Sequence, residues 1–268
     1  MLSIIILNYN QADFCRICLS NLKKAQIKLD YEIILVDNNS SNKNKIKLTE
    51  LKDNFPKVRF IFNSQNLGFA QANNLAVAKA RGEYILILNP DVIVSPGAIE
   101  KLYHFLKKDP LIGVIGPQLL NPDKSIQSSC YCFPKIYTPF VRRTCLGKYP
   151  PFKKELKRYL MQDFNHQEIK TVDWLMGACL MFKKEVFLKV KGFDQRYFLY
   201  FEDVDFCRQL NQSGYQVVYY PESKMIHFHQ RLSAEERSFK ALFKKITWIH
   251  VISAVKYFWK WKGKNRQN

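Results

Sequence analysis

The sequence lacks any run of about 20 apolar residues, the length that a helix needs to cross a bilayer. We therefore expect no membrane-spanning segment in its 268 residues. The short apolar run Leu2–Leu7 has no basic residues before it, so we expect no secretory signal. The seven cysteines, an odd number, fit a reducing compartment in which thiols act mainly as small hydrophobic side chains.

Acidic residues are scarce beside basic ones: 23 Asp and Glu stand against 42 Lys and Arg, which gives a net charge of +19. Such an excess predicts polyanionic partners, namely nucleic acid, acidic lipid headgroups or phosphorylated substrates. A nucleic-acid-binding protein is a distant alternative, because no such motif is visible and the charge is scattered. Apolar residues make up 47% of the chain, which is too many for a disordered chain.

Strand-like apolar runs alternate with helical patterns in the first part of the chain. This alternation predicts an α/β fold with a mostly parallel central sheet and helices on both faces. Beyond about residue 117 the alternation loosens, and residues 121–159 are expected to form an irregular insert. The expected strands are 2–7, 32–36, 58–62 and 84–88, then 216–220 and 224–226; Ser95-Pro96 is expected to cap a helix, and further helices are expected at 183–191 and 202–210.

Polar residues follow the carboxyl ends of the first strands, where ligands of open α/β sheets bind. The right-handed crossover rule brings these ends to one edge of the sheet. At this edge we expect Tyr9, Asp37, Asn66 and Asp91. Tyr9 offers a flat surface for a nucleotide base, and Asp37 offers a carboxylate for an acidic ring N–H.

The segment Asn89-Pro90-Asp91 follows an apolar run and ends on a carboxylate. An aspartate in this place can hold a divalent cation that in turn binds a diphosphate, although Asn-Pro-Asp is also ordinary turn chemistry. A second acidic group, Glu202-Asp203-Val204-Asp205, and His227 stand far downstream. Acids in the first turn of a helix need no catalytic role, and a histidine at a strand end needs no metal. Together, however, these residues suggest a metal–diphosphate site opposite a base.

Five segments in this order resemble the inverting glycosyltransferases of family 2, which have the GT-A (Rossmann-like) fold. Asn-Pro-Asp, Gly68-Phe69 and the pair Asn73-Asn74 are similar to the rhamnosyltransferase-like branch. Asn89 replaces the first acid of the usual Asp-x-Asp motif, and His229-Gln230-Arg231 replaces the glycines expected after His227. The five segments are Ile33–Ser40 with Asp37, Asn66–Asn74, Asn89-Pro90-Asp91, Trp174–Ala178 and Glu202-Asp203.

The resemblance implies a role for each matching residue. Asp203 is the expected catalytic base, with Glu202 and Asp205 beside it, in a single displacement that inverts the sugar. Asp91 and His227 are the expected ligands of Mg²⁺ or Mn²⁺. Trp174 and Gly177 are expected on the acceptor side. The expected nucleotide-sugar contacts are Asn8, Tyr9, Asp37, Asn66, Gly68, Asn73, Asn74 and Asn89.

The C-terminal part predicts an amphipathic helix over 238–261. A helical wheel places His250, Ser253, Lys256 and Lys260 on one narrow polar stripe, and most of the remaining residues are apolar. Such a wide apolar arc with basic ends is typical of a helix in a membrane interface. A helix packed on the domain with a solvated basic edge is the alternative.

These observations predict a catalytic domain over residues 1–235, with a nucleotide-binding half (1–117) and an acceptor-side half (118–235). Residues 236–268 would form the basic helix and tail. The expected activity is transfer from a nucleotide sugar, preferably dTDP-L-rhamnose, to a lipid-linked or glycan acceptor in bacterial cell-surface glycan synthesis. The alternative donors are a UDP-hexose or a UDP-N-acetylhexosamine. We expect a cytoplasmic protein, peripheral on the anionic inner face of the membrane, with no nucleic-acid partner.

Overall fold

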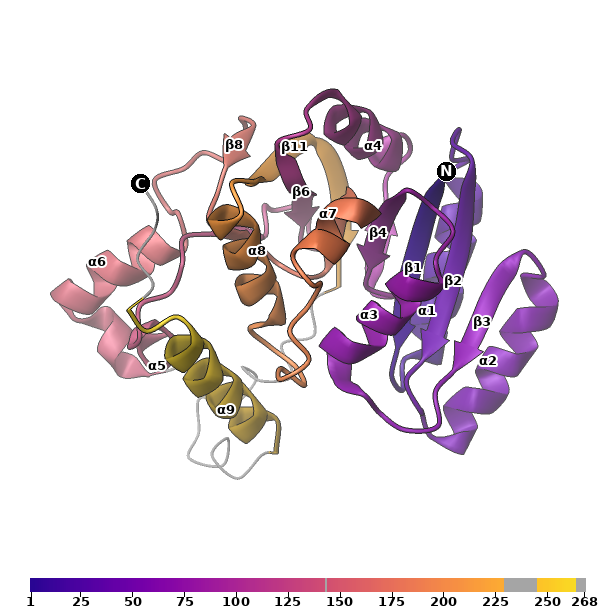
Figure 1. Cartoon of the computed structure of the whole chain (residues 1–268), viewed down its shortest axis with the longest axis horizontal. Helices are drawn as coiled ribbons and strands as arrows, with labels where there is room; N and C mark the ends of the chain where they lie inside the picture. Colours follow the sequence, from indigo (N-terminus) through magenta and orange to yellow (C-terminus); the bar gives the residue numbers. More distant parts are fainter. Residues whose placement is uncertain (143, 229–244, 264–268) are drawn as a thin grey trace.

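The computed structural model describes residues 1–142, 144–228 and 245–263 (Figure 1). A mixed sheet forms its centre, with the strand order β3-β2-β1-β4-β10-β6-β11-β5, and β8 pairs with β11. A separate two-stranded sheet is made by β7 and β9. The strands are β1 Leu2–Asn8, β2 Tyr31–Asp37, β3 Val58–Phe62, β4 Tyr84–Leu88, β5 Val92–Val94, β6 Ile112–Leu120, β7 Cys130–Tyr131, β8 Lys170–Thr171, β9 Trp174–Leu175, β10 Cys179–Lys183 and β11 Gln216–His227.

Helices cover both faces of the central sheet, and each face has its own apolar core. One core contains α1, α2 and α4, and the other contains α3, α7 and α8. This arrangement confirms the predicted fold class, including the C-terminal helix. The helices are α1 Ala12–Lys24, α2 Asn42–Asn54, α3 Gly68–Lys79, α4 Ala98–Lys108, α5 Thr138–Val141, α6 Pro150–Tyr159, α7 Lys184–Lys189, α8 Glu202–Gln212 and α9 Lys245–Lys260, with a short 3₁₀ turn at Cys145–Lys148.

The four strands predicted for the first part of the chain lie side by side and are parallel, in the order β3, β2, β1, β4. Their carboxyl ends therefore share one edge, as expected. The next strand in the sheet is β10, which runs antiparallel to both β4 and β6. An antiparallel strand in this position carries the segment just before it, residues 176–178, to the carboxyl end of β4.

Several details differ from the prediction. Helix α4 begins at Ala98 after Gly97, which has a φ of 74°, so Ser95-Pro96 stands just outside the helix. Because glycine adopts positive φ without steric cost, Gly97 rather than serine ends the preceding loop. The insert 121–159 contains a 10-residue helix, α6. The two predicted strands near the end of the sheet are one strand, β11, with an irregularity between Tyr220 and Lys224.

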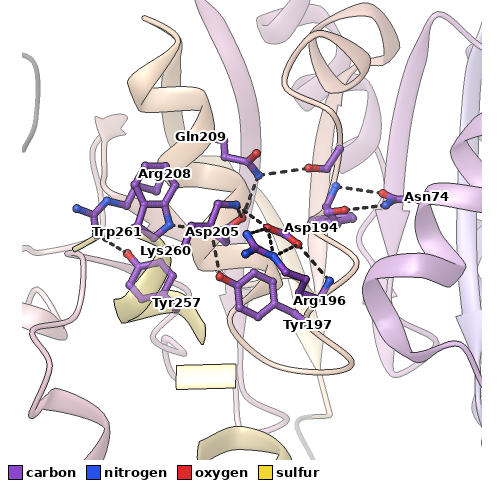
Figure 2. Close-up of polar contacts among 12 residues, drawn as sticks. Asn74, Asp194, Arg196, Tyr197, Asp205, Arg208, Gln209, Tyr257, Lys260 and Trp261 are labelled. Atoms are coloured by element: carbon purple, nitrogen blue, oxygen red, sulfur yellow. Dashed lines mark hydrogen bonds and ion pairs between the residues drawn. The ribbon is translucent and has the colours of Figure 1, made fainter. Parts of the chain in front are cut away.

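Helix α9 packs on α8 through the stripe that the sequence marked as polar (Figure 2). The Lys260 ammonium lies 2.6 Å from Asp205 and 2.8 Å from Asp194, and Trp261 donates its indole N–H to Asp205 at 2.7 Å. Tyr257 and Trp261 are buried in the same contact. The side of α9 that faces away from the domain is therefore the apolar one; its exposed residues are Trp248, Val251, Ile252, Val255 and Trp259.

No helix in the described ranges is both long and apolar enough to cross a bilayer. Residues 238–244 of the predicted C-terminal helix, and the predicted domain boundary at 235, lie outside the described residues. The predicted division at residue 117 falls inside β6, so the central sheet continues through both halves.

Candidate functional site

The end of β1 and the end of β2 are joined by a buried carboxylate. Asn8 donates its amide to Asp37 Oδ1 at 2.7 Å, and Ser40 donates both its hydroxyl and its backbone N–H to the same side chain. Asp37 is 0% exposed. It therefore orders the loop that presents the exposed ring of Tyr9 at the sheet edge. Contact between Asp37 and a nucleotide base stays a prediction, since three of its about four lone-pair positions are already occupied.

The next loop is built around Asn38. Its amide donates to Asn66 Oδ1 at 2.8 Å, and its own Oδ1 accepts the backbone N–H of Leu67 at 3.0 Å. Gly68 follows with a φ of 76°, and a Cβ at this position would lie 2.3 Å from the backbone oxygen of Phe198. Only glycine allows this approach. The predicted Asn66 and Gly68 thus join the end of β3 to the aromatic segment before α8.

Asn73 and Asn74 have different surroundings. Asn74 exchanges two hydrogen bonds with the backbone of Phe193, at 2.7 and 3.0 Å, and so ties α3 to the segment before α8 (Figure 2). Asn73 is fully buried and donates to the backbone oxygen of Phe69 at 2.9 Å. Among the described residues its side-chain oxygen has no hydrogen-bond partner. Both asparagines thus shape the loop of Gly68, and a direct contact with the nucleotide sugar stays a prediction.

Asp91 and His227 lie together although 136 positions separate them in the sequence. Asp91 stands in the turn between β4 and β5, and β5 pairs antiparallel with β11 so that Val92 is opposite His227. The backbone oxygen of Asp91 accepts the N–H of Phe228 at 2.9 Å. The Asp91 Oδ1 and His227 Nε2 atoms are 3.5 Å apart. Sheet pairing therefore creates the two-residue set that the sequence predicted.

Gln127 fixes the orientation of the His227 ring. The Gln127 Oε1 atom is 2.7 Å from His227 Nδ1, while its amide nitrogen donates to Asn121 Oδ1 and to the His227 backbone oxygen. Since Gln127 Oε1 can only accept, Nδ1 carries the proton, and the lone pair of a neutral ring is on Nε2, toward Asp91. Histidine ligands of metals are commonly held in this way through their second nitrogen.

The donor set fits a divalent cation with one carboxylate and one imidazole as protein ligands. Within the described part of the chain, no third His, Cys, Asp or Glu joins Asp91 and His227 in a cluster that could bind a metal. The remaining ligands would therefore come from the substrate, which is the usual arrangement for cations that bind nucleotide diphosphates. Asn89, the neutral replacement in the motif, is partly exposed beside them.

Asp203 is held at the start of α8 by two backbone donors. The Gly177 N–H donates to Asp203 Oδ2 at 3.0 Å, and the Val204 N–H donates to Oδ1 at 2.8 Å. Its side chain is partly exposed, whereas the neighbouring Glu202 is only 5% exposed. Asp203 is thus the carboxylate of this pair that a substrate hydroxyl can reach.

The pKa values of the two acids are shifted in the direction that a base requires. Burial raises the pKa of Asp203 to about 6, and the backbone N–H of Gly177 is the first influence that lowers it. Burial raises the pKa of Glu202 well above its usual range, and the charge of Asp203 raises it further. At neutral pH the arrangement therefore favours an ionised Asp203 beside a protonated Glu202.

The predicted acidic group does not act as one unit. Asp205 points to the other side of α8, where it is 0% exposed and forms an ion pair with Lys260 (Figure 2). The expectation that Asp205 stands beside the base as a neighbouring acid is therefore wrong. Residues two apart on a helix point in different directions, and Lys260 on α9 compensates the charge.

The Asp91–His227 pair and Asp203 are connected by the segment 176–178. The Asn89 N–H donates to the Ala178 oxygen at 2.8 Å, and the adjacent Gly177 holds Asp203. A Cβ added to Gly177 would lie 3.6 Å from the ring of Phe69, which follows Gly68. Gly177, Asp203, the Asn89–Asp91 turn and the start of α3 therefore converge at the carboxyl end of β4.

Trp174 is part of an aromatic stack next to this point. It is 6% exposed, its ring lies 4.4 Å from that of Tyr131 with an interplanar angle of 17°, and its indole N–H donates to the Cys132 oxygen. Tyr131 also stacks with Tyr159 of α6 at 5.4 Å. The predicted acceptor-side tryptophan is thus part of a buried aromatic stack, and the guanidinium group of Arg142 packs against this stack.

Sequence reasoning missed three residues of this site: Asn38, Ser40 and Gln127. The first two belong to the Asp37-Asn38-Asn39-Ser40 run, whose density of short polar side chains is a signal for a structured loop. Gln127 carried no such signal, because its contact with His227 depends on strand pairing.

Comparison with known proteins agrees with this arrangement. Residues 3–190 match the model of glycosyl transferase family 2. Residues 164–231 match the model described as the N-terminal domain of galactosyltransferase. The first match covers the sheet edge and the segment 176–178, and the second contains α8 with Glu202 and Asp203.

Two relatives are similar over most of the chain. The N-acetylglucosaminyl-diphospho-decaprenol L-rhamnosyltransferase of Mycobacterium tuberculosis is 28% identical over 85% of this chain and 76% of its own length. The rhamnosyltransferase WbbL of Escherichia coli K12 is 27% identical over 96% of this chain and 92% of its own length.

Solved structures show the same fold at low sequence identity. GalNAc-T7, crystallised with UDP, GalNAc and Mn²⁺, superposes with a TM-score of 0.67 over 87% of this chain and 44% of its own, at 18% identity. The mannosyltransferase PcManGT from Pyrobaculum calidifontis, in complex with GDP-Man and Mn²⁺, gives 0.59 over 98% of this chain and 75% of its own, at 15% identity.

Proposed function

The chain belongs to glycosyl transferase family 2, and we propose that it is an inverting, metal-dependent enzyme that transfers L-rhamnose from dTDP-L-rhamnose. The acceptor is a hydroxyl group of a lipid-linked or polysaccharide glycan in bacterial cell-surface synthesis. The names of two relatives support the sugar, and the name of the Mycobacterium tuberculosis relative also supports a diphosphate-linked lipid acceptor. The observation that carries the proposal is the link Asn89–Ala178–Gly177–Asp203, which brings the Asp203 carboxylate near the Asp91–His227 pair and so supports Asp203 as the base.

The chemistry follows from these residues. Asp203 accepts the proton of the acceptor hydroxyl, whose oxygen attacks the anomeric carbon from the face opposite the nucleoside diphosphate. The bond from that carbon to the diphosphate oxygen breaks in the same displacement, so the configuration inverts. A divalent cation, Mg²⁺ or Mn²⁺, held by Asp91 and His227 would offset the charge of the leaving diphosphate.

The donor is tested by a binding and product panel. Thermal shifts with dTDP, UDP and GDP, each with Mn²⁺ or Mg²⁺, should be largest for dTDP, because ligands that bind the native state raise its stability by mass action. Incubation with dTDP-L-rhamnose and a lipid acceptor should then give an α-L-rhamnosyl product. Product from a UDP-hexose or UDP-N-acetylhexosamine, with none from dTDP-L-rhamnose, would assign the alternative donor.

The transfer rate should depend on the ionisation of Asp203. Since burial raises its pKa to about 6 and only the ionised form accepts a proton, the rate should rise with pH through about 6 and then level off. Below the pKa it should fall about tenfold for each pH unit. The check is kcat from pH 4.5 to 8, with nucleotide affinity measured at each pH. A parallel loss of affinity would instead assign the profile to the Asp91–His227 pair.

We also propose that the protein acts at an anionic membrane surface, with α9 lying in the interface. The polar stripe of α9 faces the domain, where Lys260 forms ion pairs with Asp194 and Asp205. Two strongly exposed apolar residues, Val255 (63%) and Trp259 (75%), lie on the outer side of the helix. The net charge of +19 favours anionic lipids. A 16-residue helix with an apolar outer side can lie in the membrane interface, but 16 residues are too few to span the bilayer.

The double variant Val255→Ser/Trp259→Gln should lose affinity for vesicles that contain phosphatidylglycerol. Removing these two apolar side chains should cost about 2 kcal/mol of partition free energy, roughly 30-fold, with little change in unfolding free energy. Co-sedimentation at low and high salt measures the loss. The matched control is Ile46→Ser, a 61% exposed residue of α2, the helix that lies far from α9 across the sheet (Figure 1). Equal vesicle binding by the double variant and the wild type would remove α9 from the membrane contact.

Deleting α9 is a poor substitute for these point changes. Without Lys260 and Trp261, the buried carboxylate of Asp205 would lose its ion-pair partner and one N–H donor. Removing one partner of a buried ion pair typically costs about 3–5 kcal/mol. A truncated chain would therefore report on stability as well as on membrane binding.

A further inference from the structure

Arg142 is a cation of the insert that packs against the aromatic stack of Tyr131, Tyr159 and Trp174. It follows α5 directly, and its backbone N–H donates to Thr138 at 3.0 Å. Its guanidinium carbon lies 5.9 Å from the ring centroid of Tyr131 and 5.7 Å from that of Tyr159. These rings stack with each other, and Tyr131 stacks with Trp174, so the guanidinium group rests on a rigid aromatic surface.

The charge of Arg142 is not compensated by a carboxylate. Other cations of the insert form ion pairs: Arg158 and Lys135 with Glu155, at 2.7 and 3.4 Å. In the described ranges, no salt bridge joins Arg142 to an acidic side chain, and residue 142 as a whole is exposed. Burial raises the pKa of Tyr131 to about 12 and that of Tyr159 higher still, so both rings remain neutral phenols. The aromatic surface therefore presents one net positive charge.

Asp203 is connected to the same aromatic stack through β9 and Gly177. Strand β7 pairs Tyr131 with Trp174 of β9, and three residues after Trp174 the backbone of Gly177 holds Asp203. Burial is the main cause of the raised pKa of Tyr131, Arg142 lowers it, and Cys130 and then Asp203 raise it further, so both Arg142 and Asp203 lie within electrostatic range of this ring. An acceptor whose hydroxyl reaches Asp203 would therefore direct another part of its structure toward Arg142.

We propose that Arg142 binds a phosphate or diphosphate attached to the acceptor sugar whose hydroxyl Asp203 deprotonates. This inference rests on the proposed function and names the substrate class: an acceptor with an anionic group beside its sugar, as in a sugar linked by diphosphate to a lipid. The planar guanidinium fork suits two phosphate oxygens at once, and the aromatic rings hold it in place. The diphosphate of the donor offers the same chemistry, and the experiment separates the two sources.

The test compares two acceptors that differ only in charge. One is N-acetylglucosamine linked by diphosphate to a short polyprenyl chain, and the other is the same sugar as a neutral alkyl glycoside. Arg142→Met should lower kcat/KM for the diphosphate acceptor roughly 10- to 100-fold, mainly through KM, because charge-assisted hydrogen bonds are lost. The neutral acceptor should change by less than about twofold, and Arg142→Lys should recover part of the loss.

The controls distinguish this role from others. Lys153→Met removes an exposed cation of α6 and should leave both acceptors unchanged. Equal losses on both acceptors would show that Arg142 only supports the aromatic stack, and a weaker dTDP affinity would assign it to the donor diphosphate. Either result overturns the proposal.

A binding measurement keeps the inference separate from the proposed function. Binding of the diphosphate acceptor is measured by calorimetry with dTDP and Mn²⁺ present, for the wild type and for Arg142→Met. If the wild type transfers no sugar to either acceptor, the proposed function fails. The proposed role of Arg142 would still be supported if Arg142→Met lowered this affinity 10- to 100-fold, as expected for lost charge-assisted hydrogen bonds. It would be refuted by equal affinities of the two proteins.

Discussion

Replacing Asp203 by asparagine should lower kcat by about 10³-fold while the affinity for the nucleotide changes by less than about twofold. Asparagine keeps the shape of the side chain, and its amide oxygen can still accept the N–H of Gly177. It cannot take a proton from the acceptor hydroxyl. Because the lost interaction exists only in the transition state, kcat and kcat/KM should fall together. Single-turnover kinetics with saturating donor and acceptor measures this loss.

Glu202→Gln is the control for this prediction. Burial raises the pKa of Glu202 well above its usual range, which favours the protonated side chain that glutamine resembles. Its kcat should therefore stay within about tenfold of the wild type, since no proton-accepting group is removed. If Glu202→Gln is inactive and Asp203→Asn retains activity, the base has been assigned to the wrong neighbour.

The sequence predicted those parts of the fold that depend on local patterns. The four strands ending near Asn8, Asp37, Phe62 and Leu88 are mainly apolar runs followed by turn-forming residues, and each appears within a few residues of its expected place. Strand β10 was not predicted, because Cys179–Lys183 is short and continues directly into α7. Its antiparallel place between β4 and β6 is a long-range pairing that no local period reveals.

The orientation of α9 shows a second limit of pattern reasoning. The helical wheel correctly separated a polar stripe from an apolar arc, but it did not show which one faces the protein. The structure turns the stripe inward because Asp194 and Asp205 need the positive charge of Lys260. Charges far apart in the sequence therefore decide the orientation, and they leave the apolar arc on the outside.

For Asp37, the sequence predicted the position at the end of a strand but not the contacts of its side chain. The strand-end position was predicted, yet the carboxylate is buried and accepts hydrogen bonds from Asn8 and Ser40. Gln127 shows the converse: a residue without any motif orients His227 through one 2.7 Å contact. The contacts of Asp37 and of Gln127 both depend on which loops meet at the edge of the sheet. Local sequence patterns do not specify this meeting of loops.

Asp91→Ala should abolish metal-dependent nucleotide binding and lower transfer by about 10³-fold or more, because the leaving diphosphate would lose the charge that a bound cation supplies. Asp91 is the single carboxylate of the predicted ligand pair, since Asn89 replaces the first acid of the motif. His227 alone, held by Gln127, is a weak site for Mg²⁺ or Mn²⁺, which prefer oxygen ligands. The backbone contact of Asp91 with Phe228 does not involve its side chain, so the fold should persist.

Electron paramagnetic resonance of Mn²⁺, titrated with protein in the presence and absence of dTDP, separates the metal from the reaction. The wild type should broaden the Mn²⁺ signal strongly only when dTDP is present, because the nucleotide diphosphate completes the ligand set. Asp91→Ala should leave the signal of Mn²⁺–dTDP close to that without protein. Glu83→Ala removes an exposed carboxylate just before β4, at the end of the strand opposite to Asp91, and should behave as the wild type. Transfer at the full rate in excess chelator would show that Asp91 serves the donor without a metal, and the diphosphate charge would then have to be offset by the protein alone.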